Sequence, residues 1–230
     1  MKQLLLDIAP SPPPTLANFV PGRNIELLQA LNDIIEGNVI EGLERERFIY
    51  LWGGAGCGRS HLLQAVAGIC MRRNMNVVYF SCTHETDFIT SSEADCVTVD
   101  DVDRLDAKAQ ISLFNLYNHI REEGHAFLVV SGPAAPAQLN LRADLLTRLG
   151  WGLVYQVHEL SDEEKIKAMK SHAKDRGLDL PQEVCDYLLC HGRRDLPSLM
   201  ATLDALDGFS LANQRKITVP LVRELLQVAS

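Results

Sequence analysis

The sequence predicts an α/β protein in which a five-stranded parallel sheet is followed by a small all-helical domain. Over roughly the first 160 positions, short apolar runs alternate with longer helical patterns, which is typical of parallel sheets. A glycine-rich loop follows the first apolar run, as in phosphate-binding domains. Beyond that region the pattern is helical only. These observations together predict a nucleotide-binding α/β domain and a separate helical domain.

The predicted elements of the first domain follow one another without a long break. An amphipathic helix at 24–36, with Asn24 as its cap, precedes the sheet. Because the strands are apolar throughout, we expect helices on both faces of the sheet. The strands are expected at 48–52, 76–80, 96–99, 126–130 and 152–157, and further helices at about 60–73 and 107–123.

The composition changes at Ser161, where a capping box begins. In Ser161-Asp162-Glu163-Glu164, Ser161 and Glu164 are placed to satisfy each other's free backbone donors. Only helices are expected from here, at about 162–176, 181–190, 196–211 and 219–229. We therefore divide the chain into a flexible tail at 1–14, a nucleotide-binding domain at 15–160 and a helical lid domain at 161–230.

Charge and composition exclude several classes of protein. The net charge of −8 argues against a broad basic face for nucleic acid. No apolar stretch approaches the length of a membrane span, and the N-terminus has no secretory signal, so we expect a cytoplasmic protein without a membrane partner. None of the six cysteines forms a C-x-x-C pair, so neither zinc nor disulfides are expected and the thiols should be free.

The glycine-rich loop at 53–60 is the strongest functional motif, because it lies between an apolar strand and a helix. Its glycines let the backbone wrap phosphates, while N–H groups and the helix N-terminus attract negative charge. Ser60 is placed to hold Mg²⁺. The nucleotide-binding residues expected in this segment are Gly53, Gly54, Ala55, Gly56, Cys57, Gly58, Arg59, Ser60 and His61.

Arg59 stands where such loops carry lysine. Lysine is a compact point charge between the β- and γ-phosphates, whereas arginine is a longer planar fork, and the two are not interchangeable. Binding of a diphosphate is expected to survive this change, whereas the geometry needed to hydrolyse a γ-phosphate is not. The substitution therefore predicts firm ADP binding and weak or absent intrinsic ATPase activity.

Polar residues follow two of the predicted strands. Asp100 and Asp101 end the third strand, and Ser131 closes the fourth. Ligands collect at the carboxyl ends of parallel strands, so Asp100 is expected to hold Mg²⁺ and Asp101 to orient an attacking water. Ser131 is expected to contact that water or the γ-phosphate. The alternative for all three is an ordinary solvated turn after a strand.

Five segments make the chain resemble the AAA+ ATPase modules of the bacterial DnaA family, and within it the regulatory inactivators. They are residues 18–24, 53–60, 99–101, 147–152 and 194–196. The resemblance implies that Arg148 is the arginine finger, which acts on a nucleotide of a neighbouring subunit. It also implies that Arg194 is the sensor 2 arginine of the lid, and that Phe19 and Val20 lie near the adenine, although both also suit an ordinary core.

Two features favour an inactivator over an initiator. The chain ends at Ser230, just after the lid, where an initiator would continue into a helix-turn-helix domain. The N-terminus also resembles the peptide by which bacterial proteins bind the replicative sliding clamp, with Gln3 as a hydrogen-bonding residue and Leu4, Leu6 and Ile8 as apolar anchors. A short strand, or a tail folded back on the body, is the alternative for this segment.

The function implied is negative regulation of DNA replication initiation. The protein would dock on the DNA-loaded sliding clamp of DNA polymerase III, and touch DNA only through it. It would then stimulate hydrolysis of the ATP bound to DnaA. Its own cofactors would be ADP or ATP with Mg²⁺, and it would not turn the nucleotide over independently. A homodimer or higher homo-oligomer is compatible with an arginine finger that acts at a subunit interface. A helicase-loader-type AAA+ ATPase is the main alternative; for a metabolic enzyme, the seven histidines offer no clustered site.

Overall fold

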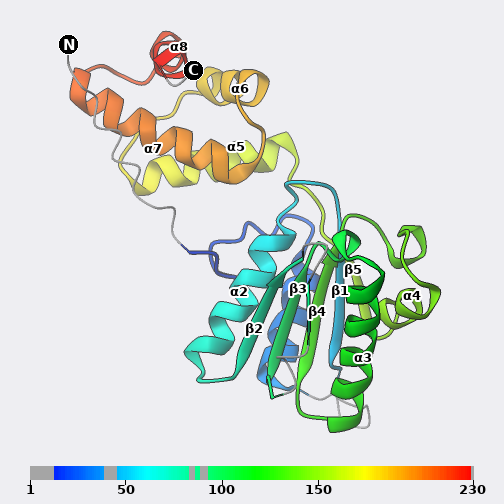
Figure 1. Ribbon diagram of the computed structural model, residues 1–230. Coiled ribbons are helices and arrows are strands. Elements are labelled where there is room, and N and C mark those ends of the chain that lie inside the picture. The colour runs from blue at the N-terminus through cyan, green and yellow to red at the C-terminus, as the bar shows by residue number, and fades with distance from the viewer. Residues whose placement is uncertain (1–12, 39–45, 83–85, 89–92, 229–230) are drawn as a thin grey trace. The chain divides into compact units, whose positions relative to one another are not determined.

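The structure, a computed structural model, describes residues 13–38, 46–82, 86–88 and 93–228. The chain divides into two compact units, one of Pro13–Glu159 and one that contains the residues from Leu160 onward. The first unit holds the sheet and the second is built of helices (Figure 1).

A five-stranded parallel sheet forms the centre of the first unit, and this confirms the predicted fold class. The strands lie in the order β2-β3-β4-β1-β5. Leu51 pairs with Ser131, and Val130 pairs with Val99, so the loop after β1 emerges at the same edge as the ends of β3 and β4. The strands are β1 (Phe48–Trp52), β2 (Val77–Ser81), β3 (Cys96–Asp100), β4 (Phe127–Gly132) and β5 (Leu153–Gln156).

Helices cover both faces of the sheet because its strands are apolar on both sides. Ile49 and Leu51 of β1 point into a core with α1 and α2, while Phe48 and Tyr50 point into a core with α3 and α4. Each fully buried aliphatic side chain in these cores contributes about 1.5–3 kcal/mol. The helices are α1 (Ile25–Glu36), α2 (Arg59–Arg72), α3 (Ala107–Glu123) and α4 (Ala143–Leu149), with short 3₁₀ helices η2 (Val102–Arg104) and η3 (Pro136–Gln138).

The start of α1 corrects one expectation. Asn24 occupies the cap position, but its side chain makes no capping hydrogen bond. Its amide nitrogen instead donates to the carbonyl oxygen of His158 at 3.0 Å, and its amide oxygen accepts from the His158 N–H at 2.7 Å. Asn24 is buried, so this reciprocal pair ties the start of α1 to the end of the sheet instead of closing the helix.

The second unit consists of α5 (Asp162–Asp175), α6 (Gln182–His191), α7 (Leu196–Asn213) and α8 (Val219–Val228). The predicted capping box is present: Ser161 Oγ accepts from the Glu164 N–H, and Glu164 accepts from the Ser161 N–H. These helices enclose an apolar core of their own, which includes Met169, Leu188 and Leu203. Across the described parts of both units, no helix combines the length and the hydrophobicity needed to cross a membrane.

Candidate nucleotide-binding and arginine-finger sites

The loop between β1 and α2 depends on glycine at two positions. A Cβ atom at Gly53 would lie 2.5 Å from the carbonyl oxygen of Val157, which is closer than real contacts allow. Gly58 has φ +104°, and a Cβ there would lie 2.7 Å from the ring of Phe19. Between them, Gly54, Ala55 and Gly56 are exposed. The loop is therefore tightly held at both ends and open at its tip.

The N-terminus of α2 supplies hydrogen-bond donors at this tip. Leu62 donates its N–H to the carbonyl of Gly58, so the earlier N–H groups of Arg59, Ser60 and His61 have no acceptor inside the helix. Ser60 is exposed, with its hydroxyl on the first turn. Free donors at a helix N-terminus suit a phosphate group, so the residues present fit the nucleotide that the motif predicts.

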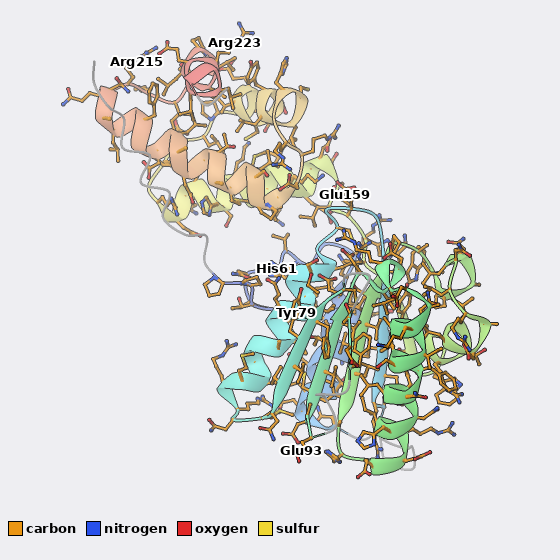
Figure 2. The ribbon with its side chains drawn as sticks, in the orientation of Figure 1. His61, Tyr79, Glu93, Glu159, Arg215 and Arg223 are labelled. Carbon is orange, nitrogen blue, oxygen red and sulfur yellow. The ribbon has the colours of Figure 1, made fainter. Side chains whose placement is uncertain are left out.

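Residues 15–20 lie beside the loop. Phe19 packs against Gly58, and its ring is 5.6 Å from that of His61 at an angle of 54°. The Nε2 atom of His61 lies 3.0 Å from the Thr15 carbonyl oxygen, at the start of α2 where Figure 2 labels it. Phe19 also packs on the core under α1 and α2, while Val20 is half-buried. The structure thus places the segment at the loop, and contact with an adenine stays a prediction.

Asp100 is nearly buried at the end of β3, and both of its carboxylate oxygens are engaged. The hydroxyl of Ser131 donates to Oδ1 at 2.5 Å, and the hydroxyl of Tyr79 donates to Oδ2 at 3.0 Å. Tyr79 lies on β2 beside α2, as Figure 2 shows, and partial burial raises its pKa to about 12. Sequence reasoning missed Tyr79, because nothing in an apolar strand marks which residue faces the next strand's carboxylate.

Ser131 joins the two aspartates. It is fully buried, donates to Asp100, and accepts the backbone N–H of Asp101 at 3.1 Å. Asp101 itself has φ +58° and ψ +55°, a left-handed conformation that is uncommon for a residue with a side chain. These bonds do not test the predicted contact of Ser131 with water or a γ-phosphate. They show that the Ser131 hydroxyl donates its proton to Asp100.

Arg59 folds back across the site to Asp101. Its Nη1 donates to the carbonyl of Gly53 and its Nη2 to Asp101 Oδ1 at 3.0 Å. The other oxygen of Asp101 pairs with Arg104 Nη2 at 3.1 Å. The Nε–H of Arg59 is buried and has no hydrogen-bond partner within the described residues. Asp101 is thus held between two guanidinium groups, and one N–H of Arg59 is left without an acceptor among the described residues.

The donor set also bears on a metal ion. Among the described residues there is no group of three or more His, Cys, Asp or Glu side chains suited to a metal. Ser60 and Asp100 offer a hydroxyl and a carboxylate oxygen, and a donor set of this kind holds Mg²⁺ together with phosphate oxygens and water.

Arg148 lies at the end of α4, and among the described residues it forms no ion pair with a carboxylate; Asp144, one turn earlier on α4, pairs with Arg142. The Nε of Arg148 donates to Asn118 Oδ1 of α3 at 3.1 Å. Its guanidinium carbon lies 3.6 Å from the ring centre of Trp151 and 4.9 Å from that of Phe114. Arg121 stacks on Trp151 as well, at 4.4 Å. The family resemblance singled out Arg148, and nothing in the sequence pointed to Asn118.

Arg194 belongs to the second unit. Its Nη2 donates to both carboxylate oxygens of Asp162, at 2.7 and 2.8 Å, and both side chains are more than half exposed. The pair joins the turn before α7 to the start of α5. Its predicted contact with phosphates stays a prediction, as does the clamp-binding role of Gln3, Leu4, Leu6 and Ile8, which lie outside the described residues.

Comparison with known proteins finds a family match within the second unit and solved structures of similar fold. Residues 162–226 match the protein family described as "Hda, lid domain". The structure resembles domain III of the replication initiation protein DnaA from Thermotoga maritima, with TM-score 0.72 and 22% identity over 94% of this chain and 96% of that one. A DnaA bound to AMPPCP and single-stranded DNA gives TM-score 0.70 and 24% identity, over 88% of this chain and 68% of that one.

The resemblance in fold extends beyond DnaA. The Holliday junction branch migration motor RuvB of Thermotoga maritima gives TM-score 0.67 at 13% identity, over 94% of this chain and 72% of that one. At these identities the solved structures establish the fold alone. The lid match is therefore the finding that distinguishes among proteins of this architecture.

Proposed function

We propose that the chain is a member of the Hda group of DnaA-family AAA+ proteins and a negative regulator of replication initiation that stimulates hydrolysis of DnaA-bound ATP. The observation that carries the proposal is the setting of Arg148. Its guanidinium is oriented by an amide and two aromatic rings, and among the described residues it forms no ion pair. Such an arginine keeps its charge for a partner.

The geometry suits an arginine finger. Only the Nε–H of Arg148 is used in its hydrogen bond to Asn118, so the two Nη groups keep their donors among the residues described. Stacking on Trp151 fixes the plane of the guanidinium without cancelling its charge. Directed at a phosphoryl group on DnaA, this arginine would stabilise charge that develops in the transition state, an effect worth about 10³–10⁵ in rate.

The nucleotide bound by this chain would stay bound and would not be hydrolysed at a significant rate. The N–H groups at the start of α2 would bind the phosphates of ADP. Ser60 and Asp100 would hold Mg²⁺, which neutralises phosphate charge when bound. Asp101 is paired with Arg59 and Arg104, so it is poorly placed to polarise an attacking water. This supports weak intrinsic ATPase activity.

The remaining parts of the proposal concern the ends of the chain. Arg194, in a lid domain that begins at residue 161, would touch the bound phosphates as the sensor 2 arginine. Residues 3–8, in a tail of residues 1–14, would dock on the sliding clamp and so bring Arg148 to DnaA near DNA. The protein would then act in the cytoplasm on DnaA and the clamp, with DNA contacted only through the clamp.

A reconstituted assay with ATP-bound DnaA and DNA-loaded clamp tests the proposal. Arg148→Ala is expected to lower the stimulated rate of ATP hydrolysis by about 10³-fold, because the finger charge is lost. Arg72→Ala, which removes an exposed arginine at the far end of α2, is the matched control and should leave the rate unchanged. Full stimulation by Arg148→Ala would refute the finger assignment.

Deletion of residues 2–8 separates the proposal from a helicase-loader function. The truncated protein should lose binding to the clamp in a pull-down and lose clamp-dependent stimulation, while its thermal melting stays unchanged. A helicase loader would not need this segment for its activity. Retained clamp binding after the deletion would place the docking surface elsewhere.

A further inference from the structure

Arg121 is the last member of a row of side chains that runs along α3, the helix that packs against α4 (Figure 1). The inference drawn from it rests on the proposed role of Arg148. The row consists of Phe114, Asn118 and Arg121, whose spacing places them on one side of a helix. Phe114 and Asn118 contact the guanidinium of Arg148 directly. Arg121 instead lies over Trp151, with its guanidinium carbon 4.4 Å from the ring centre.

Arg121 stacks on Trp151 but forms no hydrogen bond or ion pair within the described residues. It is exposed in the last turn of α3, where a positive charge is favourable in any orientation of the side chain. Its neighbours Glu122 and Glu123 are exposed too, but neither pairs with it in the described part of the chain. Holding a long exposed side chain in one position costs conformational entropy. Its place over the indole is therefore a specific contact and not the by-product of an ion pair.

The orientation of the Trp151 ring depends on its contacts with other side chains. The backbone is fixed, because the Trp151 N–H donates to the Arg148 carbonyl at 3.0 Å and a Cβ atom at Gly152 would lie 2.3 Å from the Phe48 carbonyl oxygen. The indole N–H has no acceptor among the residues described, so no hydrogen bond sets the rotation of the ring. The ring is held by Phe48, at a centre distance of 6.5 Å and an angle of 64°, and by the two arginines that stack on it.

We infer that Arg121 is a positioning residue for the arginine finger. By stacking on Trp151 it holds the indole, and the indole in turn fixes the guanidinium of Arg148, whose central carbon lies 3.6 Å from the ring centre. A cation is needed at position 121 because the electron-rich face of an aromatic ring attracts positive charge. Arg121 acts through Arg148 and does not itself touch the partner's nucleotide. It should therefore affect the rate of the stimulated reaction and not the binding of the partner.

NMR of the full chain alone, with isotope-labelled arginine, tests the structural part of this inference. Nuclei over the face of an indole are shifted upfield by its ring current, and the Arg148 Nε–H signal is identified by its loss in Arg148→Lys. Trp151→Leu gives the reference position without the indole. Arg121→Ala should move the signal toward this reference, whereas Arg121→Lys, which keeps a cation over the ring, should leave it near the wild-type position. Thermal melting of each variant confirms that it is folded.

The stimulated hydrolysis of DnaA-bound ATP tests the functional part. Arg121→Ala should lower the maximal rate about two- to fivefold, which is the factor that one exposed cation–π contact supplies. The concentration of the chain that gives half of the maximal stimulation should not change, and Arg121→Lys should restore the rate. Arg72→Ala is the matched control, because Arg72 is likewise an exposed arginine in the last turn of its helix, and its rate should equal that of wild type.

The outcomes separate this inference from the proposed function. If Arg121→Ala leaves both the Arg148 signal and the maximal rate unchanged, the positioning role is wrong, whereas the finger proposal for Arg148 stands. If Arg121→Ala raises only the concentration needed for half-maximal stimulation, Arg121 contacts the partner directly and the inference is also wrong. If wild type itself gives no stimulation, the proposed function fails, and the inference about the finger fails with it.

Discussion

Two arginines of the sheet-containing unit are held in opposite ways. Arg59 lies in the phosphate loop, where Asp101 pairs with it and the Gly53 carbonyl accepts its other nitrogen. Arg148 lies at the end of α4, where it is held by the amide of Asn118 and the ring of Trp151. The charge of Arg59 is neutralised by a carboxylate of the same unit, whereas Arg148 is held by neutral groups.

This difference indicates what each arginine is available to do. A guanidinium paired with a carboxylate has little charge left for a transition state, since the pair must be broken first. A guanidinium stacked on an aromatic ring keeps its full charge and loses mainly its freedom to rotate. The same type of side chain thus forms an internal ion pair at one site and is held by neutral groups at the other, as the proposed arginine finger requires.

The contrast between Arg59 and Arg148 is tested most directly by giving Arg148 a carboxylate partner. Asn118→Asp retains the shape of the side chain but turns the neutral partner of Arg148 into an ionic one. The finger charge is then neutralised within the chain, as that of Arg59 is. We expect the stimulated rate of DnaA-bound ATP hydrolysis to fall by about 100-fold, a substantial part of what an arginine finger supplies.

The matched comparison for this variant is Asn118→Ala. It removes the hydrogen bond to Nε but adds no charge, so the rate should fall less, by roughly tenfold, which corresponds to the loss of one positioning hydrogen bond. If both variants lower the stimulated rate equally, the lack of charge on the Asn118 amide is unimportant, and only its hydrogen bond to Arg148 matters.

A smaller effect is expected from Ser131→Ala at the other site. The substitution leaves a buried oxygen of Asp100 and the N–H of Asp101 without their shared partner. Such unsatisfied groups cost about 1–3 kcal/mol of unfolding free energy. Thr147→Ala is the control, because its exposed hydroxyl bonds only within α4 and should cost under about 0.5 kcal/mol. Equal denaturation midpoints for the two variants would show that the Ser131 bonds contribute nothing.

Much of the fold could be predicted because its signals are local. Alternation of short apolar runs with longer helical patterns places five strands within a residue or two of their observed ends, and the capping box marks the start of α5. Asn24 shows where local reasoning fails. Its residue type and position suit a helix cap, but a backbone partner far along the chain, at His158, takes its side chain.

The candidate sites were predictable only where they lie in contiguous motifs. The glycine-rich loop, Asp100 and Asp101 could be found from short segments, and Arg148 only through the family resemblance. Their partners could not: Tyr79 and Asn118 come from other elements, and sheet order and helix packing decide that they meet these residues. The sequence shows that an arginine replaces lysine at position 59, whereas its pairing with Asp101 follows only from the folded geometry.

The smallest effect concerns the hydroxyl of Tyr79, which closes the network at Asp100. Tyr79→Phe removes one hydrogen bond to the carboxylate and should lower the unfolding free energy near neutral pH by about 0.5–1.5 kcal/mol. The pKa of Tyr79 is raised from 10.0 to about 12, chiefly by burial. The folded wild-type protein therefore holds this proton more tightly than the unfolded chain does.

The sign of the pH dependence follows from this shift. The contribution of Tyr79 is complete below pH 10, where the phenol is protonated in both states, and it is lost as the pH rises from 10 to about 12. Urea denaturation of wild type and Tyr79→Phe should thus give a difference that is constant up to pH 10 and shrinks above it. Other buried tyrosines are present in both proteins and cancel. A difference that stays constant above pH 10 would mean that Tyr79 ionises alike in both states, and that the network at Asp100 does not constrain its proton.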